Sequence, residues 1–128
     1  MFGLIRTTII AVVLAFNAGS ILAQDFQRGV AAAHSGDYVT ALQEWRPLAE
    51  QGCADAQYNI GAMYELGNGV LQDNVRAHMW YNIAAANGNK KSGEWRDETA
   101  GQMTSADISK AQSMARECLS SNYKNCGW

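Results

Sequence analysis

Apolar side chains recur at intervals of three and four residues between positions 53 and 88, which is the spacing of one face of an α-helix. Over residues 54–66 this face consists of Ala56, Ile60, Met63 and Tyr64. Over residues 74–86 a wider apolar face consists of Val75, Ala77, Trp80, Tyr81, Ala84 and Ala85. The stretch is therefore predicted to fold as helix, loop and helix.

The residues at the ends of these two helices agree with that prediction. The glycine–asparagine–glycine run at 67–69 ends the first helix, because both residue types tolerate the left-handed backbone region. Asp73 can cap the second helix by accepting a backbone N–H, and Asn87-Gly88 ends it. Gly61 lies inside the first apolar face, where a glycine costs about 1 kcal/mol relative to alanine. A glycine in that place predicts that a second backbone packs close to the helix.

The helix–loop–helix pattern occurs more than once in the chain. At an offset of 36 residues the following pairs of positions match: Gly52 and Gly88, Asp37 and Asp73, Val39 and Val75, Ala41 and Ala77, Trp45 and Tyr81, and Ala49 and Ala85. A helix–turn–helix unit with a period in the mid-thirties is typical of tetratricopeptide-type arrays. Because two short helices cannot bury both their faces alone, the units are predicted to stack on one another.

Residues 45–88 resemble the Sel-one-like repeat, a tetratricopeptide-like helical repeat. The matching positions are Ile60-Gly61, Tyr64, Gly67-Asn68-Gly69-Val70, Asp73, Ala77, Trp80-Tyr81, Ala84-Ala85 and Gly88. The resemblance implies an all-α, right-handed αα solenoid of about six helices with a C-terminal capping helix. It also implies a protein–protein interaction module, although the fold does not name the partner.

Less regular units are predicted on both sides of the central one. The expected units are 25–52, 53–88 and a degenerate cap at 89–121, with a disulfide tail at 118–126. The first unit should open with a short helix at 25–35, and Pro47 should kink its second helix. Thr104 is expected to cap the last helix, at 105–120. This end of the chain resembles the common C-terminal cap of bacterial Sel-one-like proteins at Arg96-Asp97, Met103-Thr104, Ala111-Gln112 and Ala115-Arg116.

The front of the chain has the layout of a secretory signal peptide. A basic residue precedes an apolar run at 8–16, and a small residue, Ala23, ends the predicted leader 1–23. The alternative is an uncleaved membrane anchor, but polar and glycine residues at 17–20 interrupt the run before the roughly 20 apolar residues that a spanning helix needs. Residues 24–128 are then expected to form a single domain in a periplasmic or secreted protein.

The charge balance argues against two classes of partner. Ten Lys and Arg against twelve Asp and Glu give a net charge of −2, and loss of Arg6 with the leader makes it −3. No basic patch or run is present in the sequence. Nucleic acid is therefore not an expected partner, and neither is an anionic membrane surface. No membrane span is expected after signal cleavage.

The three cysteines fit an exported chain. Cys118 lies on the predicted last helix and Cys126 follows a turn, so an oxidising compartment would allow a disulfide between them. Closing this short loop should stabilise the fold by about 2.5 kcal/mol. The alternative is two unpaired thiols. Cys53 is left over, as a reactive thiol at a helix start or, more simply, as a small residue at a unit junction. No Cys/His spacing fits a zinc site, so no metal and no cofactor are expected.

The sequence carries little that points to catalysis. Ser121 and Lys124 form an S-x-x-K pattern, but it follows a helix end and lacks the S-D-N and K-T-G partners of β-lactamases. His34 has no Ser or Cys beside it that would suit a triad. The chain is therefore expected not to be an enzyme. An envelope hydrolase acting on β-lactam or peptidoglycan remains an alternative, because such activities are ascribed to some cysteine-rich relatives.

A partner-binding groove is expected on the concave side, which the first helix of each pair lines in such stacks. The expected groove residues are Gln27, His34, Asp55, Tyr58, Asn59, Glu65, Glu94 and Arg96. The favoured function is an adaptor or regulator in the bacterial cell envelope that holds a peptide or protein there. The alternative is an ordinary solvated surface on a structural envelope factor without a discrete ligand.

Overall fold

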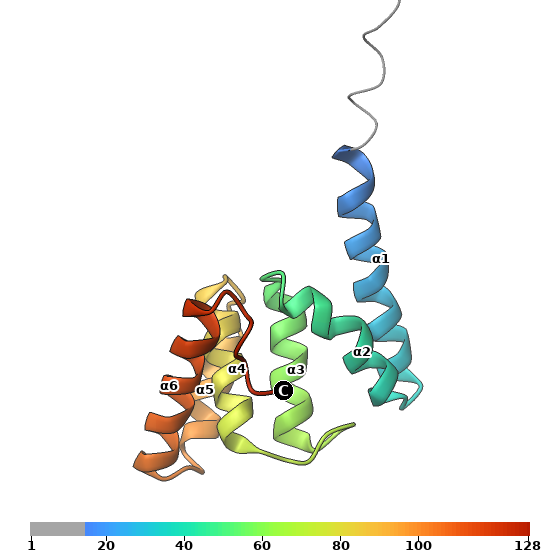
Figure 1. The fold of residues 1–128 in the computed structure, drawn as a ribbon. Helices are drawn as coiled ribbons and strands as arrows, with labels where there is room; N and C mark the ends of the chain where they lie inside the picture. Colours follow the sequence, from blue (N-terminus) through green and yellow to red (C-terminus); the bar gives the residue numbers. More distant parts are fainter. Residues whose placement is uncertain (1–14) are drawn as a thin grey trace, which may run out of the picture.

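The computed structural model describes the backbone of residues 15–128 and the side chains from residue 22 onward. Within this part of the chain there are six α-helices and no strand (Figure 1). The helices are α1 (Ala15–His34), α2 (Tyr38–Ala49), α3 (Ala54–Leu66), α4 (Asn74–Ala86), α5 (Ser92–Ala100) and α6 (Ser105–Ser120). The architecture is an all-helical repeat solenoid, as the sequence predicted.

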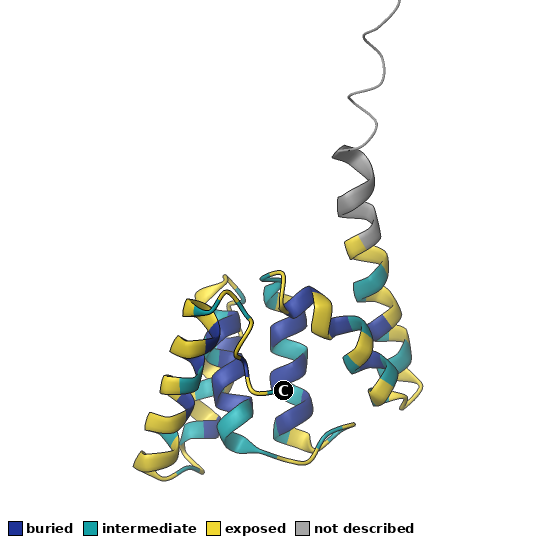
Figure 2. Cartoon of the chain, in the orientation of Figure 1, coloured by how far each residue is buried: buried dark blue, intermediate teal, exposed yellow. Residues whose placement is uncertain are grey.

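The stack is organised around α4. This helix packs extensively against α3, α5 and α6, whereas α1 packs extensively only against α2. Consistent with three neighbours, α4 is buried on most of its circumference, and its buried residues are Ala77, His78, Met79, Trp80, Tyr81, Ile83 and Ala84 (Figure 2). A helix that is apolar around most of its surface belongs in the core of a fold.

Local sequence explains where the helices begin and end. The side chains of Asp37, Asp73 and Thr104 accept backbone N–H groups at the starts of α2, α4 and α6, at 3.1 Å in each case. Gly67 ends α3 in the left-handed conformation, with φ of 70°. These caps confirm the predicted caps of α4 and α6. Pro47 lies in the last turn of α2, and the helix continues through it to Ala49.

The glycine inside α3 makes room for a side chain, so the expectation of a close second backbone was wrong. A Cβ atom on Gly61 would lie 2.7 Å from the ring of Tyr81 on α4. The preceding unit repeats this arrangement, because a Cβ on Gly29 would lie 2.2 Å from the indole of Trp45. The repeat thus pairs a glycine on its first helix with a large aromatic residue on its second.

The predicted core is confirmed. Trp45, Tyr64, Trp80, Tyr81 and Ile60 are all buried, with exposed fractions of 8% or less. Aromatic pairs join the two helices within each unit, since Phe26 and Trp45 lie 6.2 Å apart between ring centroids and Tyr58 and Tyr81 lie 5.8 Å apart. Such aromatic contacts stabilise the stack beyond the area that they bury.

The first helix is longer than expected. It begins at Ala15 rather than near residue 25, so the predicted cleavage point after Ala23 falls inside α1. Alanine and leucine, which favour a helix, make up four of the ten residues at 15–24, and the helix continues through Asn17, Gly19 and Ser20 between them. Most of the apolar run at 8–16 lies outside the described residues. Among the described helices, none has the length and hydropathy required to cross a membrane.

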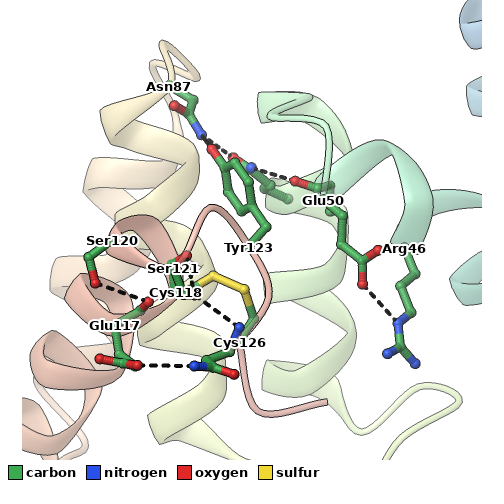
Figure 3. The surroundings of a disulfide bond; sticks show 12 residues. Arg46, Glu50, Asn87, Glu117, Cys118, Ser120, Ser121, Tyr123 and Cys126 are labelled. Atoms are coloured by element: carbon green, nitrogen blue, oxygen red, sulfur yellow. Dashed lines mark hydrogen bonds and ion pairs between the residues drawn. A yellow bond between two sulfur atoms is a disulfide. The ribbon is translucent and has the colours of Figure 1, made fainter.

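The C-terminal tail is fastened to the last helix. The disulfide between Cys118 and Cys126 is present, as predicted, and Cys53 is a free thiol (Figure 3). From Cys126 the chain returns toward the middle of the molecule and ends in front of α3, between α2 and α4 (Figure 1).

Candidate functional site

Two cavities lie between the first and second units. One has a volume of about 430 Å³, and its walls are Leu22, Ala23, Phe26, Gln27, Leu48, Gln51, Gly52, Cys53 and Asp55. The other has a volume of about 260 Å³, and its walls are Val30, Ala33, His34, Tyr38, Trp45 and Asn59. Both therefore combine residues of α1 with residues of α2 and residues at or near the start of α3.

The two cavities lie in one line between α1 and α3, and together they are described as one groove. On α1 their walls use Gln27, Val30 and His34, which follow one another at intervals of three and four and so share a helix face. On α3 they use Asp55 and Asn59, which are four residues apart and share a face for the same reason. We call this the α1–α3 groove. A groove that is open between α1 and α3 agrees with the helix packing, because these two helices are not among the pairs in extensive contact.

The floor of the α1–α3 groove is apolar and its rim is polar. Trp45 and Leu48 of α2 form buried parts of the floor. The indole N–H of Trp45 donates to the carbonyl oxygen of Phe26 at 3.2 Å, which fixes the ring against α1. The rim presents amides, one imidazole and one carboxylate, on Gln27, Asn59, His34 and Asp55. This combination suits a peptide, whose side chains need apolar contact and whose backbone needs hydrogen-bond partners.

Buried hydrogen bonds hold the α3 wall of the groove in place. The amide of Gln57 is fully buried, donates to the carbonyl oxygen of Ala49 at 2.9 Å and accepts from Asn87 at 2.9 Å. Asp55 at the rim accepts from Asn89 at 3.0 Å. The beginning of α3 is therefore tied both to the end of α2 and to the end of α4.

The structure divides the predicted groove residues into two groups. Gln27, His34, Asp55 and Asn59 line the α1–α3 groove. Tyr58, Glu65 and Arg96 do not line it. They lie beside α4, and each is half-buried rather than freely exposed as expected. Glu94 is an exposed residue of α5.

The half-buried group is occupied by contacts with α4. The hydroxyl of Tyr81 donates to Glu65 at 2.5 Å, and the ring of Tyr58 packs on that of Tyr81. Arg96 donates to Asn82 at 3.0 Å and to Asp97 at 2.9 Å. Burial, and then the hydrogen bond to Glu65, raise the pKa of Tyr81 far above its usual value, so the phenol stays protonated at physiological pH. These residues stabilise the stack.

Sequence reasoning missed the apolar half of the groove. Phe26, Val30 and Tyr38 contribute to its walls, but in the sequence they read as ordinary core positions of their helices. The available signal was the match of Gly29 with Gly61 on the first helices and of Trp45 with Tyr81 on the second helices, which pairs Trp45 with Gly29. This match does not show that Phe26, Val30 and Tyr38 stay half-buried, because that depends on the packing between helices.

The S-x-x-K pattern and a possible metal site were the other candidates for a functional site. The hydroxyl of Ser121 donates to the carbonyl oxygen of Cys118 at 3.1 Å and accepts from the backbone N–H of Asn125 at 2.9 Å, so it shapes the turn after α6. In the part of the chain that the structure describes, no three His, Cys, Asp or Glu residues gather as a metal site would require.

A stack of helix pairs with an open groove on one side defines a tetratricopeptide-like helical-repeat protein. The family model that matches the chain is the Sel1 repeat, over residues 54–89, which comprise α3, α4 and the loop between them. The chain thus contains a Sel1 repeat, and the resemblance noted in the sequence is confirmed. Repeats of this kind generally mediate protein–protein interaction and are typically not enzymes. A comparison with curated proteins finds no match.

Proposed function

We propose that the chain is an exported protein-binding module, an adaptor or regulator of the bacterial cell envelope, that holds a peptide or loop of a partner protein in the α1–α3 groove. The observation that carries the proposal is that the two cavities lie along one face of α1 and one face of α3. Their combined walls supply an apolar floor and a hydrogen-bonding rim, which together suit a peptide chain. The Sel1 repeat supports the same class of function.

Export is supported by two further features. The order of basic residue, apolar run and small residue before Gln24 is that of a secretory leader. The disulfide between Cys118 and Cys126 is of a kind that persists in oxidising compartments such as the periplasm. Together these two features support a periplasmic or secreted location.

The test is capture of partners from periplasmic extract by immobilised protein comprising residues 24–128. Asn59→Trp should abolish capture, because its side chain would fill the smaller cavity. Asp55→Ala and His34→Ala should weaken capture while the melting temperature changes little, because both residues are exposed. The matched control is Gln112→Ala, an exposed change on α6 away from the groove.

The outcomes separate the proposal from its alternatives. A partner that is lost with Asn59→Trp and retained by the control supports binding in the α1–α3 groove. Equal capture by all folded variants would place binding on another face. Absence of any specific partner for the wild-type protein would favour a structural envelope factor without a discrete ligand.

A further inference from the structure

The tail after α6 makes contacts that a simple helix cap would not need. The ring of Trp128 lies 4.8 Å from that of Trp80 on α4, and the guanidinium of Arg46 on α2 lies 4.4 Å above Trp128 on a cation–π contact. The carbonyl oxygen of Gly127 accepts from Nε of Arg76 at 2.9 Å. The last two residues of the tail, Gly127 and Trp128, thus touch two different units.

These contacts bridge a gap in the helix packing. α2 packs extensively on α1 and α3, and α4 packs on α3, α5 and α6, but α2 and α4 are not among the pairs in extensive contact. α4 and α6, the next two second helices of the stack, do pack on each other. Between the first and second units, Trp128 occupies the place that direct contact between second helices would fill (Figure 1). We call this place the α2–α4 seam.

The turn that aims the tail at the seam is unfavourable by itself. Asn122 and Tyr123 have φ values of 54° and 64°, in the left-handed region that residues other than glycine seldom adopt. Asparagine tolerates this region, but an adjacent tyrosine does not do so readily. The hydroxyl of Tyr123 does accept from Asn87 at 2.9 Å (Figure 3). A covalent link across the turn would offset this cost by keeping the tail near α6.

We propose that residues 121–128 are an oxidation-dependent strap: formation of the Cys118–Cys126 disulfide seats Trp128 in the α2–α4 seam and so joins the first unit to the second. In the reduced protein no cross-link stabilises the left-handed backbone of Asn122 and Tyr123. Trp128 therefore leaves its place between α2 and α4, and the seam opens. The first unit is then held to the second mainly through the contact of α2 with α3.

The chemistry of closure is thiol–disulfide exchange. A thiolate of Cys118 or Cys126 attacks a disulfide of an oxidant, forms a mixed disulfide and releases one thiol of the oxidant. The second cysteine thiolate then attacks the mixed disulfide, which leaves the protein disulfide and a reduced dithiol oxidant. Overall two electrons and two protons pass to the oxidant. In the closed state Cys118 and Cys126 are 0% and 2% exposed, so an external thiol has little access to the bond.

The strap has a consequence for the α1–α3 groove. α2 provides the floor of that groove through Trp45 and Leu48, and Arg46 on the same helix holds the strap. Binding of Trp128 in the α2–α4 seam therefore also stabilises the position of α2, which forms the floor of the groove. This consequence rests on the proposed function, whereas the strap itself does not.

Hydrogen exchange measured by mass spectrometry tests the strap without any partner. Three proteins comprising residues 24–128 are compared: the oxidised wild type, the double variant Cys118→Ser/Cys126→Ser, and Trp128→Ala with its disulfide intact. In both variants the amides of α2 should exchange about tenfold faster or more, while those of α4 change by less than about threefold. Leu119→Ala is the control, since this residue of α6 is 39% exposed and should leave α2 unchanged.

Each outcome of this experiment either supports or overturns the strap. Unchanged α2 exchange in Trp128→Ala would overturn the strap even if the double serine variant fails to fold. Equal acceleration of α2 and α4 would also overturn it, because that result reports global destabilisation. Wild type unfolded and refolded in dithiothreitol should show the open pattern, and reoxidation with glutathione disulfide should restore slow exchange in α2. If fully reduced protein already exchanges as slowly as the oxidised protein, oxidation does not close the seam.

Discussion

Single side chains decide how closely the helices of this repeat approach one another. Tyr81 lies against the bare backbone of Gly61, and Trp45 lies against that of Gly29 in the unit before. A large aromatic ring on one helix is therefore matched by the absence of a side chain on its neighbour. The penalty of a glycine within a helix is offset by the burial of a tyrosine or tryptophan.

Gly61→Ala should destabilise the fold by about 1–3 kcal/mol, because the added methyl group would overlap a ring that has no free space to move into. The overlap is with Tyr81, at 2.7 Å from the added Cβ atom. Urea unfolding followed by circular dichroism measures the change. Gly93→Ala is the matched control, since its nearest neighbour would be the end of Arg96 at 3.9 Å. Equal stability of the two variants would refute the steric explanation.

His78 should make stability depend on pH in the weakly acidic range. Burial lowers the pKa of this imidazole, and the nearby guanidinium of Arg96 lowers it further, while Asp97 acts in the opposite sense. As pH falls below about 6.5, the unfolded chain takes up a proton that the folded protein does not, so stability is complete above this pH and falls below it.

Melting temperatures of wild type and His78→Gln, measured between about pH 7.5 and pH 5, provide the check. The wild type should lose stability toward the acidic end, and the variant should lose less because it has no imidazole at this position. Comparison of slopes is needed rather than of absolute values, since the substitution also changes packing in a buried place. Parallel slopes would show that His78 does not titrate differently in the folded state.

At the scale of helices, the capping side chains contribute more to the stability of the fold than their exposure suggests. Asp73 accepts the backbone N–H of Arg76 at 3.1 Å and its guanidinium at 2.7 Å, and its own N–H donates to the carbonyl oxygen of Tyr64 at 2.9 Å. It therefore ends the glycine loop and starts the most heavily packed helix of the stack.

Asp73→Ala should cost about 1–2 kcal/mol, whereas Asp73→Asn should cost only a few tenths of a kcal/mol beyond the lost ion pair, because asparagine caps as well as aspartate. The ion pair with Arg76 is partly exposed and contributes at most about 1 kcal/mol. Thermal unfolding of both variants measures the difference. An asparagine variant as unstable as the alanine variant would assign the role to charge instead of capping.

Local signals in the sequence determined the helices whose ends they mark. The bounds of α3, α4 and α6 follow from Gly67, Asp73 and Thr104, and the structure agrees with the predicted spans. The start of α1 could not be predicted in this way, because the helix continues through Asn17, Gly19 and Ser20, residue types that usually mark helix ends. The disulfide was predictable from spacing, but the seat of Trp128 depends on contacts between residues far apart in the chain.

The division of the groove residues shows the same limit. Gln27, His34, Asp55 and Asn59 were predicted from their place on first helices, and they line one groove. Tyr58, Glu65 and Arg96 met the same criterion but turned toward α4. The helix face alone could not separate the two groups, because the separation depends on packing: α3 and α5 both pack on α4, whereas α1 and α3 are not among the pairs in extensive contact.

For the whole molecule, cleavage of the predicted leader would determine which N-terminus faces the groove. Leu22 and Ala23 form one end of the larger cavity, so cleavage before Gln24 should remove that end and widen the opening. Mass spectrometry of the native protein from the periplasm is expected to find an N-terminus near Gln24. A full-length chain recovered from the membrane fraction would contradict both export by cleavage and the widened groove.

Because α1 packs extensively on only one neighbour, its packing affects the binding free energy of any partner. α1 is secured along one side by α2, while α4 has three neighbours, so α1 belongs to the part of the fold that opens with the smallest free energy. A ligand seated between α1 and α3 would act as the second neighbour that α1 lacks. Part of its binding energy would then be spent on ordering this helix, and its affinity would rise with every change that makes α1 stiffer in the unbound protein.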